Sequence, residues 1–74
     1  MHKAQVAKIA DSADLIVGGY AMKKHELGIR IVNLNSGNAL IVSKDNDVLE
    51  TSMEDIEVAV ALDYLKVNRS FMEA

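Results

Sequence analysis

The last third of the chain shows the apolar spacing of an α-helix. From residue 51 onward it reads TSMEDIEVAVALDYLKVNRSFMEA, and apolar positions recur there every three or four residues. Two capping pairs fit the start, Thr51 with Glu54 or Ser52 with Asp55, because each offers side-chain acceptors for backbone N–H groups. Both pairs predict a helix that begins near residue 52.

This predicted helix carries apolar side chains around most of its circumference. One stripe consists of Met53, Ile56, Val60, Tyr64, Val67 and Phe71. A second stripe consists of Val58, Ala61, Leu62, Leu65 and Met72. One small sheet covers one stripe, so we expect the second to face the N-terminal segment, a second copy of the chain or a partner protein. The second stripe is therefore the candidate protein interface.

Three runs before this helix have the character of β-strands. They are LGIRIVNL at residues 27–34, ALIVS at residues 39–43 and VLE at residues 48–50, all rich in β-branched or aliphatic residues. Turn sequences separate them: NSGN, where Gly37 can take the left-handed conformation, and KDND. The three runs predict an antiparallel meander that leads into the helix.

The first 24 residues give a weaker pattern. HKAQVAKIA has helical periodicity and predicts a short N-terminal helix. We prefer a strand to a helix over roughly residues 14–23, with Gly18 and Gly19 at a bulge, because each glycine would cost a helix about 1 kcal/mol relative to Ala. The predicted fold is α+β: a short N-terminal helix, a three- to four-stranded antiparallel meander and a long C-terminal helix packed on one face of the sheet.

Length and composition predict a single domain over residues 1–74. Half of the 74 residues are hydrophobic and three are aromatic, so the core must be aliphatic. A chain this short buries roughly 60% of the surface of its unfolded form, and oligomerisation is a common source of further burial. There is no Cys for a disulfide or a thiolate metal site. No apolar run approaches a membrane span and no secretory signal is visible, so we expect a cytoplasmic protein.

Residues 33–47, NLNSGNALIVSKDND, surround an apolar run with polar side chains that suit a ligand or a metal ion. Asp45 and Asp47 have the spacing that opens a calcium-binding loop. Positions 5, 6 and 12 of such a loop need an oxygen ligand, Gly and Glu, and the chain has Leu, Glu and Ile there. We therefore interpret the stretch as two turns around a strand, and we expect no metal and no cofactor.

Catalytic side chains are sparse. No serine lies in a nucleophile-elbow pattern, and the glycines form no phosphate-binding pattern. His2 and His25 are the two histidines, and neither has a carboxylate at a zinc-binding spacing. We expect no enzymatic activity, with a small enzyme subunit or toxin-like domain that uses His25 as an alternative.

A second alternative is a nucleic-acid-associated regulator. Lys23, Lys24 and Arg30 cluster around one predicted turn and are the possible contacts to nucleic acid. The net charge of −3, the acidic start of the last helix and the lack of aromatic residues among the basic ones argue against this function.

The segment from residue 38 to the end, NALIVSKDNDVLETSMEDIEVAVALDYLKVNRSFMEA, resembles the C-terminal half of small uncharacterised bacterial domains of unknown function. In those domains an apolar strand, an acidic turn, a VLE-like strand and a final helix follow one another, and some are encoded beside a second small protein in proposed toxin–antitoxin pairs. The His-rich segment that they often carry upstream is reduced here to His25. We expect a protein–protein interaction or oligomerisation module, acting as a homodimer or with a protein partner.

Overall fold

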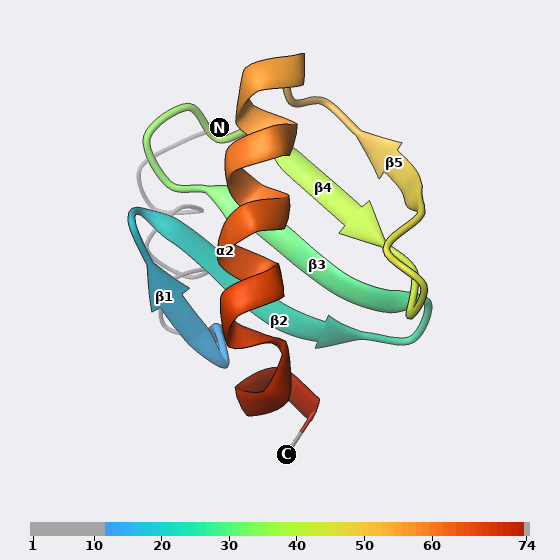
Figure 1. Ribbon diagram of the computed structural model, residues 1–74. Helices are drawn as coiled ribbons and strands as arrows, with labels where there is room; N and C mark the ends of the chain where they lie inside the picture. Colours follow the sequence, from blue (N-terminus) through green and yellow to red (C-terminus); the bar gives the residue numbers. More distant parts are fainter. Residues whose placement is uncertain (1–11, 74) are drawn as a thin grey trace.

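The computed structural model describes residues 12–73 as a single antiparallel sheet with a helix across one face (Figure 1). The elements are β1 (Leu15–Val17), β2 (Tyr20–His25), β3 (Gly28–Asn33), β4 (Ala39–Val42), β5 (Val48–Thr51) and α2 (Asp55–Glu73). The strand order in the sheet is the order along the chain. The predicted N-terminal helix is not among these elements, because residues 1–11 lie outside the described part of the chain.

The predicted strand count is wrong, because residues 14–23 form two strands and not one. Gly18 and Gly19 have φ angles of 58° and 82°, and they make a two-residue turn that pairs Val17 with Tyr20. Positive φ at two successive positions is the geometry of a tight hairpin turn, which glycine adopts without a steric penalty. The sheet therefore has five strands, where the sequence predicted three or four.

Helix α2 covers one face of the sheet, and the side chains on that face are buried. Strand residues alternate between the two faces, so every second residue of β2, β3 and β4 points toward the helix. The buried core cluster consists of Tyr20, Met22, Ile29, Ile31, Leu40, Val42, Met53, Ala61, Leu65 and Met72. Nine of these ten residues are aliphatic, so packing of Ile, Val, Leu, Ala and Met side chains stabilises the domain, as the composition predicts.

The helix begins at Asp55, three residues later than the capping pairs predict. The hydroxyl of Thr51 donates a hydrogen bond to the Ala39 carbonyl (3.0 Å), and the Ser52 hydroxyl accepts one from the Ala39 N–H (2.9 Å). Both predicted caps are thus used to attach the end of β5 to β4. The first helical turn instead has Glu57, whose carboxylate accepts the Glu54 N–H at 3.4 Å.

The two turns around β4 are stabilised by their own side chains. Gly37 has a φ of 79° in the loop between β3 and β4, as predicted. In the turn between β4 and β5, the Ser43 hydroxyl accepts hydrogen bonds from the N–H groups of Asp45 (3.2 Å) and Asp47 (3.1 Å), and Asn46 has a φ of 67°. Both segments serve as chain reversals.

Candidate functional site

The five residues predicted as a protein interface face the sheet of their own chain. Ala61, Leu65 and Met72 are buried in the core, and Val58 and Leu62 are half-buried against it. Ala61, which has a small side chain and is 0% exposed, allows the helix to approach the sheet closely. Within one chain these five side chains therefore form part of the core or pack against it.

The other side of α2 carries large apolar side chains that the sheet does not cover. Ile56 is 78% exposed, Val67 is 80% exposed and Phe71 is 58% exposed. Val60 lies between them along the sequence and is half-buried against the core of its own chain. Successive members of this set of four are separated by four, seven and four residues, so they lie along one side of the helix. We call these four residues the outer strip. All four belong to the stripe that the sequence predicted to face the sheet.

The outer strip is symmetric about its centre. Ile56 and Phe71 are equally far along the helix from the point between residues 63 and 64, and so are Val60 and Val67. Two charged side chains, Asp63 and Lys66, lie exposed beside the strip near this centre. Such an arrangement matches its own copy when two helices run antiparallel.

The residues predicted to contact nucleic acid do not form one patch. Lys23 and Arg30 are paired across β2 and β3 on the outer face of the sheet, away from α2. Lys24 follows Lys23 in the strand and therefore points to the opposite face. The Lys23 ammonium donates a hydrogen bond to the Ser12 carbonyl at 2.8 Å. Two of the three predicted contacts thus share a face, and the third does not.

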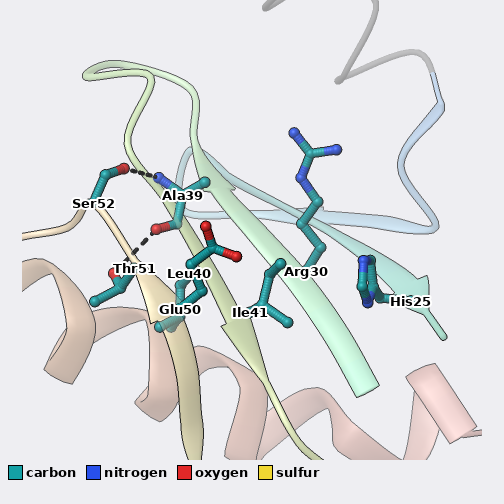
Figure 2. A pocket seen from close by; sticks show the side chains of 8 residues that line it. All are labelled: His25, Arg30, Ala39, Leu40, Ile41, Glu50, Thr51 and Ser52. Atoms are coloured by element: carbon teal, nitrogen blue, oxygen red, sulfur yellow. Dashed lines mark hydrogen bonds between the residues drawn. The ribbon is translucent and has the colours of Figure 1, made fainter. Parts of the chain in front are cut away.

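A shallow groove of about 340 Å³ crosses the outer face over β3, β4 and β5 (Figure 2). Its floor includes Ala39 and Ile41, and Arg30 and Glu50 lie on the two strands that flank Ile41. His25 lies at its far end, as Figure 2 shows. The groove thus has one basic side chain, Arg30, and one acidic side chain, Glu50, above an apolar floor.

A second pocket, of about 400 Å³, lies at the end of the sheet near the last turns of α2. We call it the basic pocket. It is lined by Lys24, His25, Gly28, Ile29, Lys44, Arg69 and Met72. Sequence reasoning grouped Lys24 with its neighbours in the chain and missed Lys44 and Arg69, because these two are distant in sequence and only the fold brings them to Lys24.

The polar loop between β3 and β4 converges on Glu57. The Glu57 carboxylate accepts hydrogen bonds of 2.9 Å from the Asn33 amide, the Ser36 hydroxyl and the Asn38 amide. Hydrogen bonds from Asn38 and Ser36 are the main reason why the pKa of Glu57 lies below its ordinary value. Because these polar groups are bonded to one another, the loop serves to attach the sheet to α2.

Tyr20 lies beside this hydrogen-bonded loop. Its ring packs against Tyr64 with 5.6 Å between the ring centres, and its hydroxyl is 3.5 Å from the Asn33 amide. Burial, followed by the negative charge of Glu57, raises the pKa of Tyr20 above its ordinary value. The hydroxyl therefore stays protonated at neutral pH and acts as a hydrogen-bonding group.

Among residues 12–73, no group of three or more His, Cys, Asp or Glu side chains is placed to hold a metal ion. In the same part of the chain, no helix is long and apolar enough to cross a membrane.

Comparison with known proteins identifies one family. The model of a family of unknown function, DUF7723, matches residues 3–72, which is nearly the whole chain. No curated protein and no solved structure matches the chain.

Proposed function

The chain belongs to the DUF7723 family, a family of unknown function, and we propose that it is a protein–protein interaction module that forms a homodimer through the outer strip. The observation that carries this proposal is the exposure of Ile56, Val67 and Phe71 along one side of α2. Single exposed apolar residues are normal, but a row of large ones on one helix face is typical of an interaction surface.

The positions of the strip favour a second copy of the chain as the partner. In a two-fold antiparallel pair, Ile56 of one copy lies opposite Phe71 of the other, and Val60 lies opposite Val67. Each contact then occurs twice, which is the condition for a closed symmetric dimer. A partner of unrelated sequence would not need this symmetry.

Charges beside the strip suit the same arrangement. Antiparallel pairing brings Asp63 of one copy beside Lys66 of the other, on both sides of the two-fold axis. This attraction offsets the repulsion between the two Asp63 carboxylates, which approach each other near the axis. The pairs are solvent-exposed, so they contribute to the choice of partner and orientation more than to affinity.

The size of the strip predicts a modest affinity. From residue 56 to residue 71 the helix rises about 22 Å, and the contact is one helix wide. A contact of this length and width buries a surface area at the lower end of the range for specific interfaces. We therefore expect a dissociation constant that is roughly micromolar.

The first test measures the mass of the chain by sedimentation over a wide range of concentration. We expect a monomer–dimer equilibrium that Val67→Asp weakens at least about tenfold, because a charge would be buried against Val60 of the other copy. Leu49→Asp makes the same apolar-to-acidic change at an exposed position of β5, outside α2, and should leave the equilibrium unchanged. Circular dichroism confirms that both variants are folded. A chain that is monomeric at every concentration would contradict the proposal.

The second test measures the orientation of the helices. The chain contains no Cys, so single introduced thiols can be followed without interference. An equimolar mixture of Val60→Cys and Val67→Cys should form mixed disulfide well above the roughly one half of all dimers that random pairing gives, because antiparallel pairing places residue 60 opposite residue 67. A mixed product at or below that statistical share would mean that the copies meet in another way.

A further inference from the structure

We propose that the free edge of β5 binds an extended segment of a partner protein, in which basic and apolar residues alternate, as a sixth strand of the sheet. Within residues 12–73, β5 is the last strand of the sheet and pairs with β4 on one side only (Figure 1). All four residues of β5 are exposed. The inference is independent of the proposed dimer, because β5 contains no residue of the outer strip.

The backbone of β5 has hydrogen-bonding groups that point away from β4. The Asp47 carbonyl accepts the Ser43 N–H at 2.9 Å, and the Ser52 N–H donates at 2.9 Å to the first carbonyl of β4. The carbonyl and the N–H of one trans peptide unit point in opposite directions. The Val48 N–H and the Thr51 carbonyl therefore point away from β4, so the edge offers a donor and an acceptor to another strand.

The side chains of β5 determine which residues a sixth strand would carry. Val48 pairs with the buried Val42 and so lies on the side of the sheet that α2 covers, yet it is 43% exposed. Glu50 pairs with Ile41 and lies on the outer face, where it lines the groove over β3, β4 and β5 (Figure 2). Residues of a neighbouring strand alternate between the same two faces. Apolar residues of the added strand would therefore contact Val48, and the basic residues between them would contact Glu50.

The charge around β5 favours a basic partner. Between Lys44 and Lys66 the sequence contains seven acidic residues and no basic one, although the net charge of the whole chain is only −3. Five of the seven are exposed in β5 or in the segments directly before and after it: Asp45, Asp47, Glu50, Glu54 and Asp55. A concentration of one sign of charge attracts a segment of the opposite sign and disfavours one of the same sign.

The same charges make a second copy of the chain a poor partner for this edge. Two β5 strands side by side would bring Asp47, Glu50 and Glu54 of one copy close to the same residues of the other. Like charges across neighbouring strands are destabilising, and charged residues on an edge strand oppose pairing between identical copies. The edge is therefore protected against self-association and open to a basic strand.

The test uses a capped synthetic peptide of alternating lysine and valine, with binding to the full chain followed by NMR. We expect saturable binding and slower hydrogen exchange of the Val48 N–H in the complex, because that group then donates to the peptide. The same peptide with methylated backbone nitrogens keeps its charge but cannot pair as a strand, so it should bind at least roughly tenfold more weakly. A peptide of alternating glutamate and valine should not bind measurably.

Two variants of the chain separate contact at β5 from attraction to the net charge. Glu50→Lys should weaken binding of the lysine–valine peptide roughly fivefold or more, because an attractive contact becomes repulsive. Glu26→Lys makes the same change at an exposed position in the turn between β2 and β3 and should have a smaller effect, so it is the matched control. Val67→Asp should still bind the peptide and slow the exchange of the Val48 N–H, so failure of the dimer would leave this inference intact.

Three results would overturn the proposal. The first is equal binding of the methylated and unmethylated peptides, or equal losses in Glu50→Lys and Glu26→Lys, which would mean attraction to charge only. The second is binding that leaves the exchange of the Val48 N–H unchanged, since the peptide would then lie elsewhere. The third is self-association that Leu49→Asp abolishes and Val67→Asp does not, because the edge of β5 would then be occupied by a second copy of the chain.

Discussion

Glu57 joins two parts of the chain that are far apart in sequence. Its carboxylate lies in the first turn of α2 and accepts hydrogen bonds from Asn33 at the end of β3 and from Ser36 and Asn38 in the loop that follows. A negative charge is favourable at this place, because the first turn of a helix presents backbone N–H groups. The loop thereby fixes the direction in which the helix crosses the sheet.

We expect Glu57→Gln to lower the melting temperature at neutral pH and to have a smaller effect in acid. The pKa of Glu57 is below its ordinary value of 4.5 in the folded protein. A lowered pKa means that the carboxylate stabilises the fold fully above the ordinary value, and that this contribution is lost as the pH falls through the folded-state pKa. Thermal unfolding of both proteins between neutral and acidic pH measures the difference.

Glu54→Gln is the control for this experiment, since Glu54 is exposed and is the neighbouring acidic residue before the helix. The two substitutions remove the same charge. If both variants lost stability equally with the same pH dependence, general charge and not the loop contacts of Glu57 would be the cause.

The sequence correctly identified the polar residues of this loop as part of a turn, and it did not identify Glu57 as their partner. Turn preference is local, so residues 33–38 and Gly37 could be interpreted from their immediate neighbours. The contacts to Glu57 join residues that are 19 to 24 positions apart. Such contacts depend on where the helix lies, which a pattern of adjacent residues does not contain.

Among the secondary-structure elements, the hairpin of β1 and β2 depends on its two glycines in different ways. An added Cβ at Gly18 would lie 2.4 Å from the ring of Tyr64, whereas at Gly19 the nearest atom would be 3.6 Å away on Asn35. Both residues have a left-handed conformation, which costs a non-glycine residue about 1–2 kcal/mol. Gly18 is therefore needed for two reasons: its left-handed backbone conformation and the lack of space for a Cβ atom beside Tyr64.

We predict that Gly19→Ala lowers the free energy of unfolding by about 1–2 kcal/mol and that Gly18→Ala lowers it further. Urea denaturation of the two variants gives both values. In a Tyr64→Ala background the excess for Gly18→Ala should disappear, because the ring that it would touch is absent. An equal cost at the two glycines in both backgrounds would refute the role of Tyr64.

Apolar periodicity predicts the C-terminal helix, but it does not predict which side of the helix faces the sheet. The spacing of apolar residues predicted both the helix and its two stripes, but each stripe is apolar enough to face a sheet. The structure places the stripe of Ala61 and Leu65 inward and leaves Ile56, Val67 and Phe71 of the other stripe exposed. Met53 and Tyr64 of that other stripe also pack in or against the core, so neither stripe is wholly inside or outside.

The contacts that hold the helix in place are not visible in its own periodicity. Glu57 bonds to side chains before and within the loop between β3 and β4, and Thr51 and Ser52 bond to β4. These contacts join segments that are distant in sequence, so they become visible only in the fold.

At the scale of the whole molecule, shortening a side chain should affect stability differently on the two faces of α2. Leu65 is 1% exposed in the core, so its removal leaves a cavity in a domain with few other sources of stability. Val67 is exposed on the outer strip and has little contact to lose within one chain. The assignment of the two stripes can therefore be tested by comparing these residues.

We predict that Leu65→Ala lowers the free energy of unfolding by about 2–5 kcal/mol, which is a large part of the stability of a small domain. Val67→Ala should change it by less than about 0.5 kcal/mol at concentrations where the chain is monomeric. Chemical denaturation in dilute protein measures both. A larger loss for Val67→Ala than for Leu65→Ala would mean that the helix packs through its other side.

The order of elements along the chain also has a consequence for synthesis. The ribosome completes all five strands before it makes the 19 residues of α2, which takes about 1–4 s at usual translation rates. During that interval Met22, Ile31 and Leu40 have no helix to cover them. A released chain truncated before residue 55 would therefore leave the inner face of the sheet without the helix that covers it.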